Sequence, residues 1–204
     1  MKSQSFGIND LARRLSLPGI IVLIVLLNVY WVITLEAFGT QFEQVANAPL
    51  LDLQNVERIL SPQEATDLIT SYSPEARTLY WVFFILDNLM PPIVFGSISL
   101  LWAYALQRFP AKWVNQLSTS PLLMVPFGVG FFDCLENLCF VLAMSSEPQT
   151  ALSTMQIGMV FVQVKVVFLF LTFALTPLLI ITAAINQTRS FMDKRRQINL
   201  GVQS

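Results

Sequence analysis

The chain has 204 residues, of which 54% are hydrophobic and only 12% charged, and its formal net charge is −1. This charged fraction is about half that of ordinary soluble domains, which indicates a membrane protein. No basic domain is present to meet nucleic-acid phosphates, so we expect no nucleic-acid partner. The absence of histidine excludes Ser-His proteases and histidine-dependent zinc hydrolases in their usual forms.

Four long apolar segments predict four transmembrane helices, because roughly 20 apolar residues suffice to cross a bilayer. The predicted spans cover about 19–38, 79–106, 121–144 and 155–185. We interpret the first as an uncleaved helix, since its apolar run exceeds the usual core of a signal peptide. The predicted fold is all-α, a polytopic membrane protein in which residues 1–204 form a single four-helix transmembrane domain.

The segment 39–72 is predicted to be an external loop that carries one short helix. Ser61-Pro62-Gln63-Glu64 has the pattern of a capping box with proline at the first helical position. A helix through about Ser71 would place four apolar or aromatic residues on one side: Ala65, Leu68, Ile69 and Tyr72. Three arrangements are open: a helix on the membrane surface, a helix that caps the bundle, or a solvated loop with one helical turn.

The distribution of lysine and arginine predicts the orientation of the spans. Nine of the twelve basic residues lie in the N-terminal segment, the loop after the second span, and the C-terminal tail. Arg58 and Arg77 lie on the other side among many acidic residues. The positive-inside rule therefore predicts that both termini are cytoplasmic and that the protein is a multi-pass protein of a bacterial inner membrane.

Several polar residues lie inside the predicted spans, where ionisable groups are rare. A charged side chain at a helix centre costs roughly 2.5–3.5 kcal/mol, so these groups must face one another or water. We take them as the candidates for ligand binding or proton relay. They are Asp87 and Asn88 in the second span, Asp133, Glu136 and Asn137 in the third, and Lys165 in the fourth. Asn28 in the first span is interpreted as a contact between helices.

The depths and helix faces of these groups predict a single cluster. At 1.5 Å per residue, Asp87 and Lys165 lie roughly 12 and 13 Å below the outer boundary, and Glu136 and Asp133 roughly 10 and 15 Å. Spacings of three and four put Asp133, Glu136 and Asn137 on one helix face. A stripe of small and polar residues on the fourth span is typical of close helix contacts: Gly158, Lys165, Thr172 and Thr176.

Three carboxyl groups and one lysine cannot all be ionised without a net charge of −2 in the cluster. We therefore expect Asp87 or Asp133 to be protonated and Lys165 to pair with Glu136. Pro91 and Pro92 cannot donate to the carbonyls four residues earlier, which leaves the Asp87 and Asn88 carbonyls in need of a partner. Lys165 or a water molecule is the expected donor.

Cys134 and Cys139 face different directions on one helix and are expected to be free, inert thiols.

Two short segments and the fourth-span lysine resemble a loose group of uncharacterised small four-span bacterial membrane proteins. The segments are Leu86-Asp87-Asn88-Leu89-Met90-Pro91 and Phe132-Asp133-Cys134-Leu135-Glu136-Asn137. The resemblance covers roughly residues 79 to 185, and Asp-x-x-Glu-Asn is its most specific part. It implies the four-span fold and a role for the cluster, but no reaction, substrate or cofactor.

Three functions remain open from the sequence. The first is binding of a polar or cationic ligand, or proton relay, which four helices would serve best as a homo-oligomer. The second is a membrane enzyme that acts on a lipid or isoprenoid, with Glu136 or Asp133 as acid or base and Lys165 orienting it. The third is an accessory subunit whose cluster only secures packing. We expect no cofactor and no metal ion, and the partners predicted are the lipid bilayer and a small polar or lipid ligand.

Overall fold

The computed structural model describes residues 17–51, 58–109 and 121–201. These residues form helices and no strands. The elements are α2 (Leu17–Ala46), α4 (Pro62–Ser71), α5 (Pro74–Leu106), the short 3₁₀ helix η1 (Pro121–Met124), α7 (Val125–Met144) and α8 (Pro148–Gly201). Four of them are long and apolar enough to cross a membrane, which confirms the predicted all-α fold with four spans.

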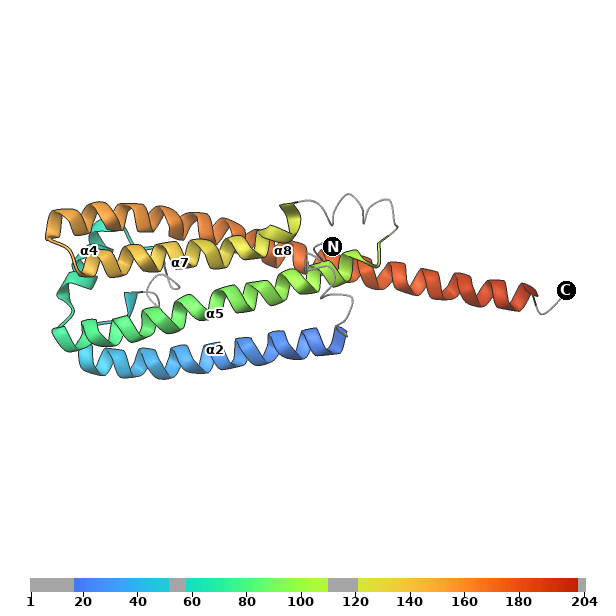
Figure 1. The fold of residues 1–204 in the computed structure, drawn as a ribbon, viewed down its shortest axis with the longest axis horizontal. Helices are drawn as coiled ribbons and strands as arrows, with labels where there is room; N and C mark the ends of the chain where they lie inside the picture. The colour runs from blue at the N-terminus through green and yellow to red at the C-terminus, as the bar shows by residue number, and fades with distance from the viewer. Residues whose placement is uncertain (1–16, 52–57, 110–120, 202–204) are drawn as a thin grey trace, which may run out of the picture.

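The four long helices lie side by side along the long axis of the molecule, with each one antiparallel to the next (Figure 1). α2 packs on α5, α5 on α7, and α7 on α8, while α4 lies across the end of α7 and α8. α8 has 54 residues, or roughly 80 Å at 1.5 Å per residue. Because a hydrocarbon core is only about 30 Å thick, its last part projects beyond the other helices (Figure 1).

Three of the four long helices, α2, α5 and α8, are longer than the apolar segments that predicted them. The third span differs: its first residues form η1, and α7 itself begins at Val125 instead of at 121. α2 continues to Ala46, which makes part of the predicted loop 39–72 helical, and α5 begins at Pro74. α8 begins at Pro148 and runs to Gly201. Helical hydrogen bonding continues into polar flanks, whereas an apolar run reports only the segment suited to hydrocarbon.

The bundle has two apolar clusters, one near each end. The cluster at the end covered by α4 gathers large side chains from five helices; among them are Phe42, Ile69, Tyr72, Tyr80, Phe140 and Met155. The other lies toward the C-terminal end of α5, around Trp102, Leu106 and Leu123. The acidic and basic side chains within the predicted spans of α5, α7 and α8 lie between these two apolar clusters.

The outer surface of the spans is apolar, as contact with lipid requires. Phe170 is 72% exposed on α8 and Ile85 is 65% exposed on α5. α2 is the most exposed of the four, because it packs mainly on α5 and most of its branched side chains point outward. The described surface therefore presents a belt of large apolar side chains around the polar interior.

The short helix in the predicted external loop is present, and it caps the bundle. The Ser61 hydroxyl accepts from the Glu64 amide at 3.3 Å, and the Glu64 carboxylate accepts from the Ser61 amide at 2.8 Å, which completes the capping box. Ala65 and Ile69 are fully buried beneath it. Arg77 then joins the helix ends, because its guanidinium donates to the carbonyls of Thr70, Tyr72 and Met144.

Acid is expected to loosen α4 before the spans. The Arg58 guanidinium and the Ser61 cap lower the pKa of Glu64 to about 2. A lowered folded-state pKa stabilises the helix above the ordinary pKa of about 4.5, and this contribution is lost as the pH falls through about 2. Amide protection in α4, corrected for intrinsic exchange, should fall over that interval.

The Glu64→Gln variant should lack this acid response, because it keeps a capping acceptor but no ionisable group. Both partners are exposed, so the effect should be modest and should shrink in high salt. An unchanged acid response in Glu64→Gln would assign the loosening to another group.

Candidate functional site

α5, α7 and α8 bring five of the six candidate residues together in one buried layer. We call Asp87, Asp133, Glu136, Asn137 and Lys165 the polar layer. On α5, Asp87 lies between Phe83 of one apolar cluster and Val94 of the other. On α8, Lys165 lies in the same way between Val162 of the first cluster and Leu175, which packs on the second. The layer is thus enclosed by apolar packing on both sides.

Lys165 forms two ion pairs across the α7–α8 contact. Its Nζ donates to Asp133 Oδ1 at 2.9 Å and also to Glu136 Oε1. The spacing of three residues places both carboxylates on the face of α7 that meets α8. The predicted Lys165–Glu136 pair is therefore confirmed, and Asp133 shares the same ammonium group.

Asn137 extends the layer to α5. Its Nδ2 donates to Asp87 Oδ2, and it lies 3.5 Å from Asp133 Oδ2, at the outer limit of a hydrogen bond. The amide thus joins carboxyl groups on two helices. A continuous set of polar contacts runs from Asp87 through Asn137 and Asp133 to Lys165 and Glu136.

Burial differs along the layer. The side chain of Glu136 is 2% exposed, whereas those of Asp133 and Lys165 are 14% and 21% exposed. Asp87 is also buried, at 5% exposure. Access to the layer is therefore greatest on the side where Lys165 meets Asp133, and Asp87 and Glu136 lie deeper.

Asn88 does not join the polar layer. Its side-chain amide donates to the Phe84 carbonyl at 2.7 Å, within α5. Its own carbonyl, which Pro92 cannot use, accepts from the Cys134 thiol at 3.7 Å. Lys165 or a water molecule was the expected donor to this carbonyl. Lys165 donates to Asp133 and Glu136 instead, and the donor found at the Asn88 carbonyl is the Cys134 thiol. Cys134 and Cys139 are both free thiols, as predicted.

Small residues allow the helices to approach closely around the layer. A Cβ on Gly130 would lie 3.0 Å from the backbone nitrogen of Pro92, so α7 meets α5 at the two prolines. A Cβ on Gly158 would lie 2.9 Å from Cys139 Cβ, at the contact of α8 with α7. The predicted stripe on the fourth span thus faces the bundle.

The C-terminal members of that stripe, Thr172 and Thr176, lie where α8 packs against α5. Thr172 is fully buried and donates to the Phe168 carbonyl. Thr176 accepts from Trp102 Nε1 at 2.8 Å.

Asn28 behaves differently from its prediction: it is exposed on α2 and donates to the Ile24 carbonyl of its own helix. The outward rotation of that face of α2 explains the difference.

An apolar cavity opens beside the polar layer. It measures about 540 Å³ and lies where α7 meets α8 and the prolines of α5; Pro92, Met124, Phe127, Gly128, Gly130, Phe131, Cys134 and Phe168 line it. Cys134 is the neighbour of Asp133 in the chain and contacts the Asn88 carbonyl. The cavity therefore brings a space suited to hydrocarbon next to buried acidic groups.

The fold and the site together define a class: a polytopic all-α membrane protein with a charged layer inside its bundle. No protein family model matches this sequence, and neither a curated protein nor a solved structure matches it. The resemblance to four-span bacterial proteins thus stays a prediction. In the described ranges 17–51, 58–109 and 121–201, no group of three His, Cys, Asp or Glu side chains could hold a metal ion.

Proposed function

We propose that the protein binds and relays protons within the membrane at its polar layer. The observation that carries this proposal is the ratio of charges: Asp87, Asp133 and Glu136 accompany one lysine, Lys165. With all four groups ionised, the layer would hold a net charge of −2. Each such charge costs roughly 2.5–3.5 kcal/mol inside a membrane helix, which favours uptake of a proton.

The contacts favour Asp87 as the group that holds the proton. Asp133 and Glu136 both accept from the Lys165 ammonium group, which stabilises their ionised forms. Asp87 accepts a hydrogen bond from the neutral amide of Asn137, a contact that a protonated carboxyl group can also make through its carbonyl oxygen. Of the two acids that the sequence left open, Asp87 is therefore the better candidate.

A proton suits the layer better than another cation. The Lys165 nitrogen already occupies the position between Asp133 and Glu136 that a cationic ligand would take. Such a ligand would have to displace the ammonium group. A proton needs no such space, because it can bind to a carboxylate of the layer while Lys165 keeps both ion pairs.

Infrared difference spectroscopy of the protein in lipid vesicles tests this proposal. The wild type should show the C=O stretching band of a protonated carboxylic acid, and Asp87→Asn should lack it. Asp87→Asn should also lose proton flux into the vesicles, measured with an enclosed pH-sensitive dye. Glu75→Gln, which removes an exposed acid at the start of α5, is the matched control and should keep both signals.

Absence of the band and the flux in the wild type would refute proton relay. That result would favour the accessory role, in which the layer only fixes the packing of α5, α7 and α8.

A lipid-modifying enzyme is the second candidate, favoured by the cavity of about 540 Å³ beside Asp133. An acyl or isoprenoid chain in this cavity would bring its head toward the acidic groups, where Glu136 or Asp133 could act as acid or base. Mass spectrometry of vesicle lipids after incubation would reveal product formation. Products made by the wild type and not by Glu136→Gln would support this reading over proton relay.

We further propose that the protein lies in a bacterial inner membrane with both termini in the cytoplasm. The excess of basic residues before α2, after α5 and in the C-terminal part of α8 supports this orientation. A single cysteine introduced after Gly201, in a variant without the natural thiols, should resist an impermeant thiol reagent in intact cells.

A proton-relay role also favours a homo-oligomer, since four helices are few for a conducting monomer.

A further inference from the structure

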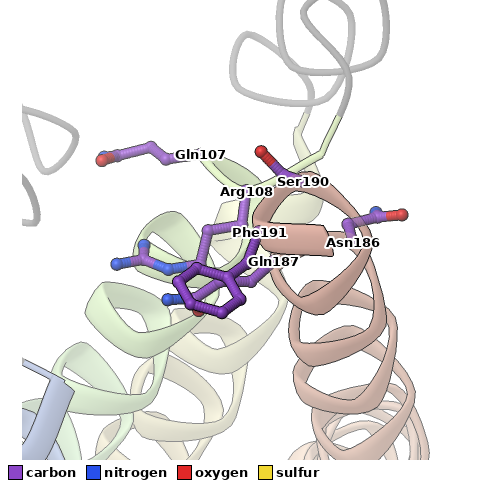
Figure 2. A pocket seen from close by; sticks show the side chains of 6 residues that line it. All are labelled: Gln107, Arg108, Asn186, Gln187, Ser190 and Phe191. Atoms are coloured by element: carbon purple, nitrogen blue, oxygen red, sulfur yellow. The ribbon is translucent and has the colours of Figure 1, made fainter. Parts of the chain in front are cut away.

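A second polar site lies at the opposite end of the bundle from α4. There, a cavity of about 580 Å³ opens between the C-terminal end of α5 and the C-terminal part of α8. Its described lining combines a cationic side chain with three carboxamides, a hydroxyl and an aromatic ring (Figure 2). These residues are Arg108, Gln107, Asn186, Gln187, Ser190 and Phe191.

The cavity lies where the apolar part of the bundle ends. The hydrogen bond from Trp102 to Thr176 sets the level of α5 against α8. Continuing from that contact, α5 is apolar to Leu106 and α8 is apolar to Ile185, after which both helices turn polar. Lipid phosphates lie just outside the hydrocarbon core, so the cavity is at their depth.

Two contacts with Tyr104 hold the Arg108 side chain in place. Its Nη1 donates to the Tyr104 carbonyl at 2.7 Å, and its guanidinium carbon lies 3.4 Å from the centroid of the Tyr104 ring. That hydrogen bond uses one of the five N–H groups of a guanidinium. Stacking on an aromatic ring limits the freedom of the side chain, which lowers the entropy lost when an anion binds.

We propose that this cavity binds the phosphate of an anionic lipid headgroup. Arg108 would supply the charge, and the Gln187 amide, which lies on the same side of α8 as the guanidinium (Figure 2), would donate a further hydrogen bond. Among the residues that the structure describes, no carboxylate lines the cavity to attract the ammonium of a zwitterionic headgroup. Exposed apolar side chains lie just above it on α8, at Leu178, Ile181 and Ile185, where acyl chains would continue into the bilayer.

Native mass spectrometry of the full chain in detergent tests the proposal. Phosphatidylglycerol should be retained in preference to phosphatidylcholine with the same acyl chains. Arg108→Gln should weaken phosphatidylglycerol retention roughly tenfold or more, since a charge-assisted hydrogen bond is lost. Arg189→Gln is the matched control: Arg189 is exposed on α8, outside the cavity lining, and its loss changes the net charge equally.

Ser190→Glu provides a second variant should Arg108→Gln fail to fold, because Ser190 is exposed and the substitution brings a carboxylate to the cavity. It too should lower phosphatidylglycerol retention. Equal losses in Arg108→Gln and Arg189→Gln would overturn the proposal, since surface charge alone would then explain binding. Glycerol phosphate tested alone should bind far more weakly than the lipid; equal binding would overturn the assignment to a lipid.

Discussion

Replacing Lys165 with Met is expected to destabilise the bundle by about 3–5 kcal/mol, the usual cost of removing one partner from a buried ion pair. The substitution leaves Asp133 and Glu136 in the membrane interior without their shared ammonium group. Reversible unfolding in mixed detergent micelles should show the loss. The loss should be smaller in acid, where the two carboxyl groups can take up protons.

Two further variants separate the charge effect from the change in side-chain shape. Val166→Met puts the same new side chain on the neighbouring position, which is 41% exposed at the lipid surface, and should be close to neutral. Adding Asp133→Asn and Glu136→Gln to Lys165→Met should recover much of the stability, because no charge then remains unpaired. If Lys165→Met unfolds like the wild type, the ion pairs do not support the fold.

Replacing Gly130 with Ala is expected to cost about 1–3 kcal/mol, as overpacking of a well-packed interior does. The new Cβ would lie 3.0 Å from the backbone nitrogen of Pro92 and 3.2 Å from the Pro91 carbonyl carbon. Backbone atoms in a helix cannot rotate away as a side chain can, so α7 must move from α5. Since Asp87 lies one turn from Pro91, the contact between Asp87 and Asn137 should weaken as well.

Gly96→Ala is the matched control on α5. Its Cβ would meet only the Phe127 ring, at 3.4 Å, which is ordinary contact, so the substitution should be neutral or slightly stabilising. Unfolding in micelles measures both variants. Equal stabilities for Gly130→Ala and Gly96→Ala would show that the close contact at the prolines has no energetic role.

Local patterns were enough to predict the layout of the chain. Apolar length predicts four spans without knowledge of any neighbour, because the bilayer sets that length. The Ser61-to-Glu64 capping box predicts the start of α4 for a similar reason, since its hydrogen bonds close within one turn. Burial cost and helix spacing predicted the Lys165–Glu136 pair, because an isolated charge in hydrocarbon must find a partner.

Only the packed structure decided contacts that depend on how the helices rotate against one another. That Asn28 faces outward, that Cys134 serves the Asn88 carbonyl, and that Asn137 joins Asp87 could not be derived from one helix alone. The cavity around Arg108 likewise needs the register of α5 against α8. A sequence sets which face of a helix is polar, but close packing of the facing side chains sets which partner that face meets.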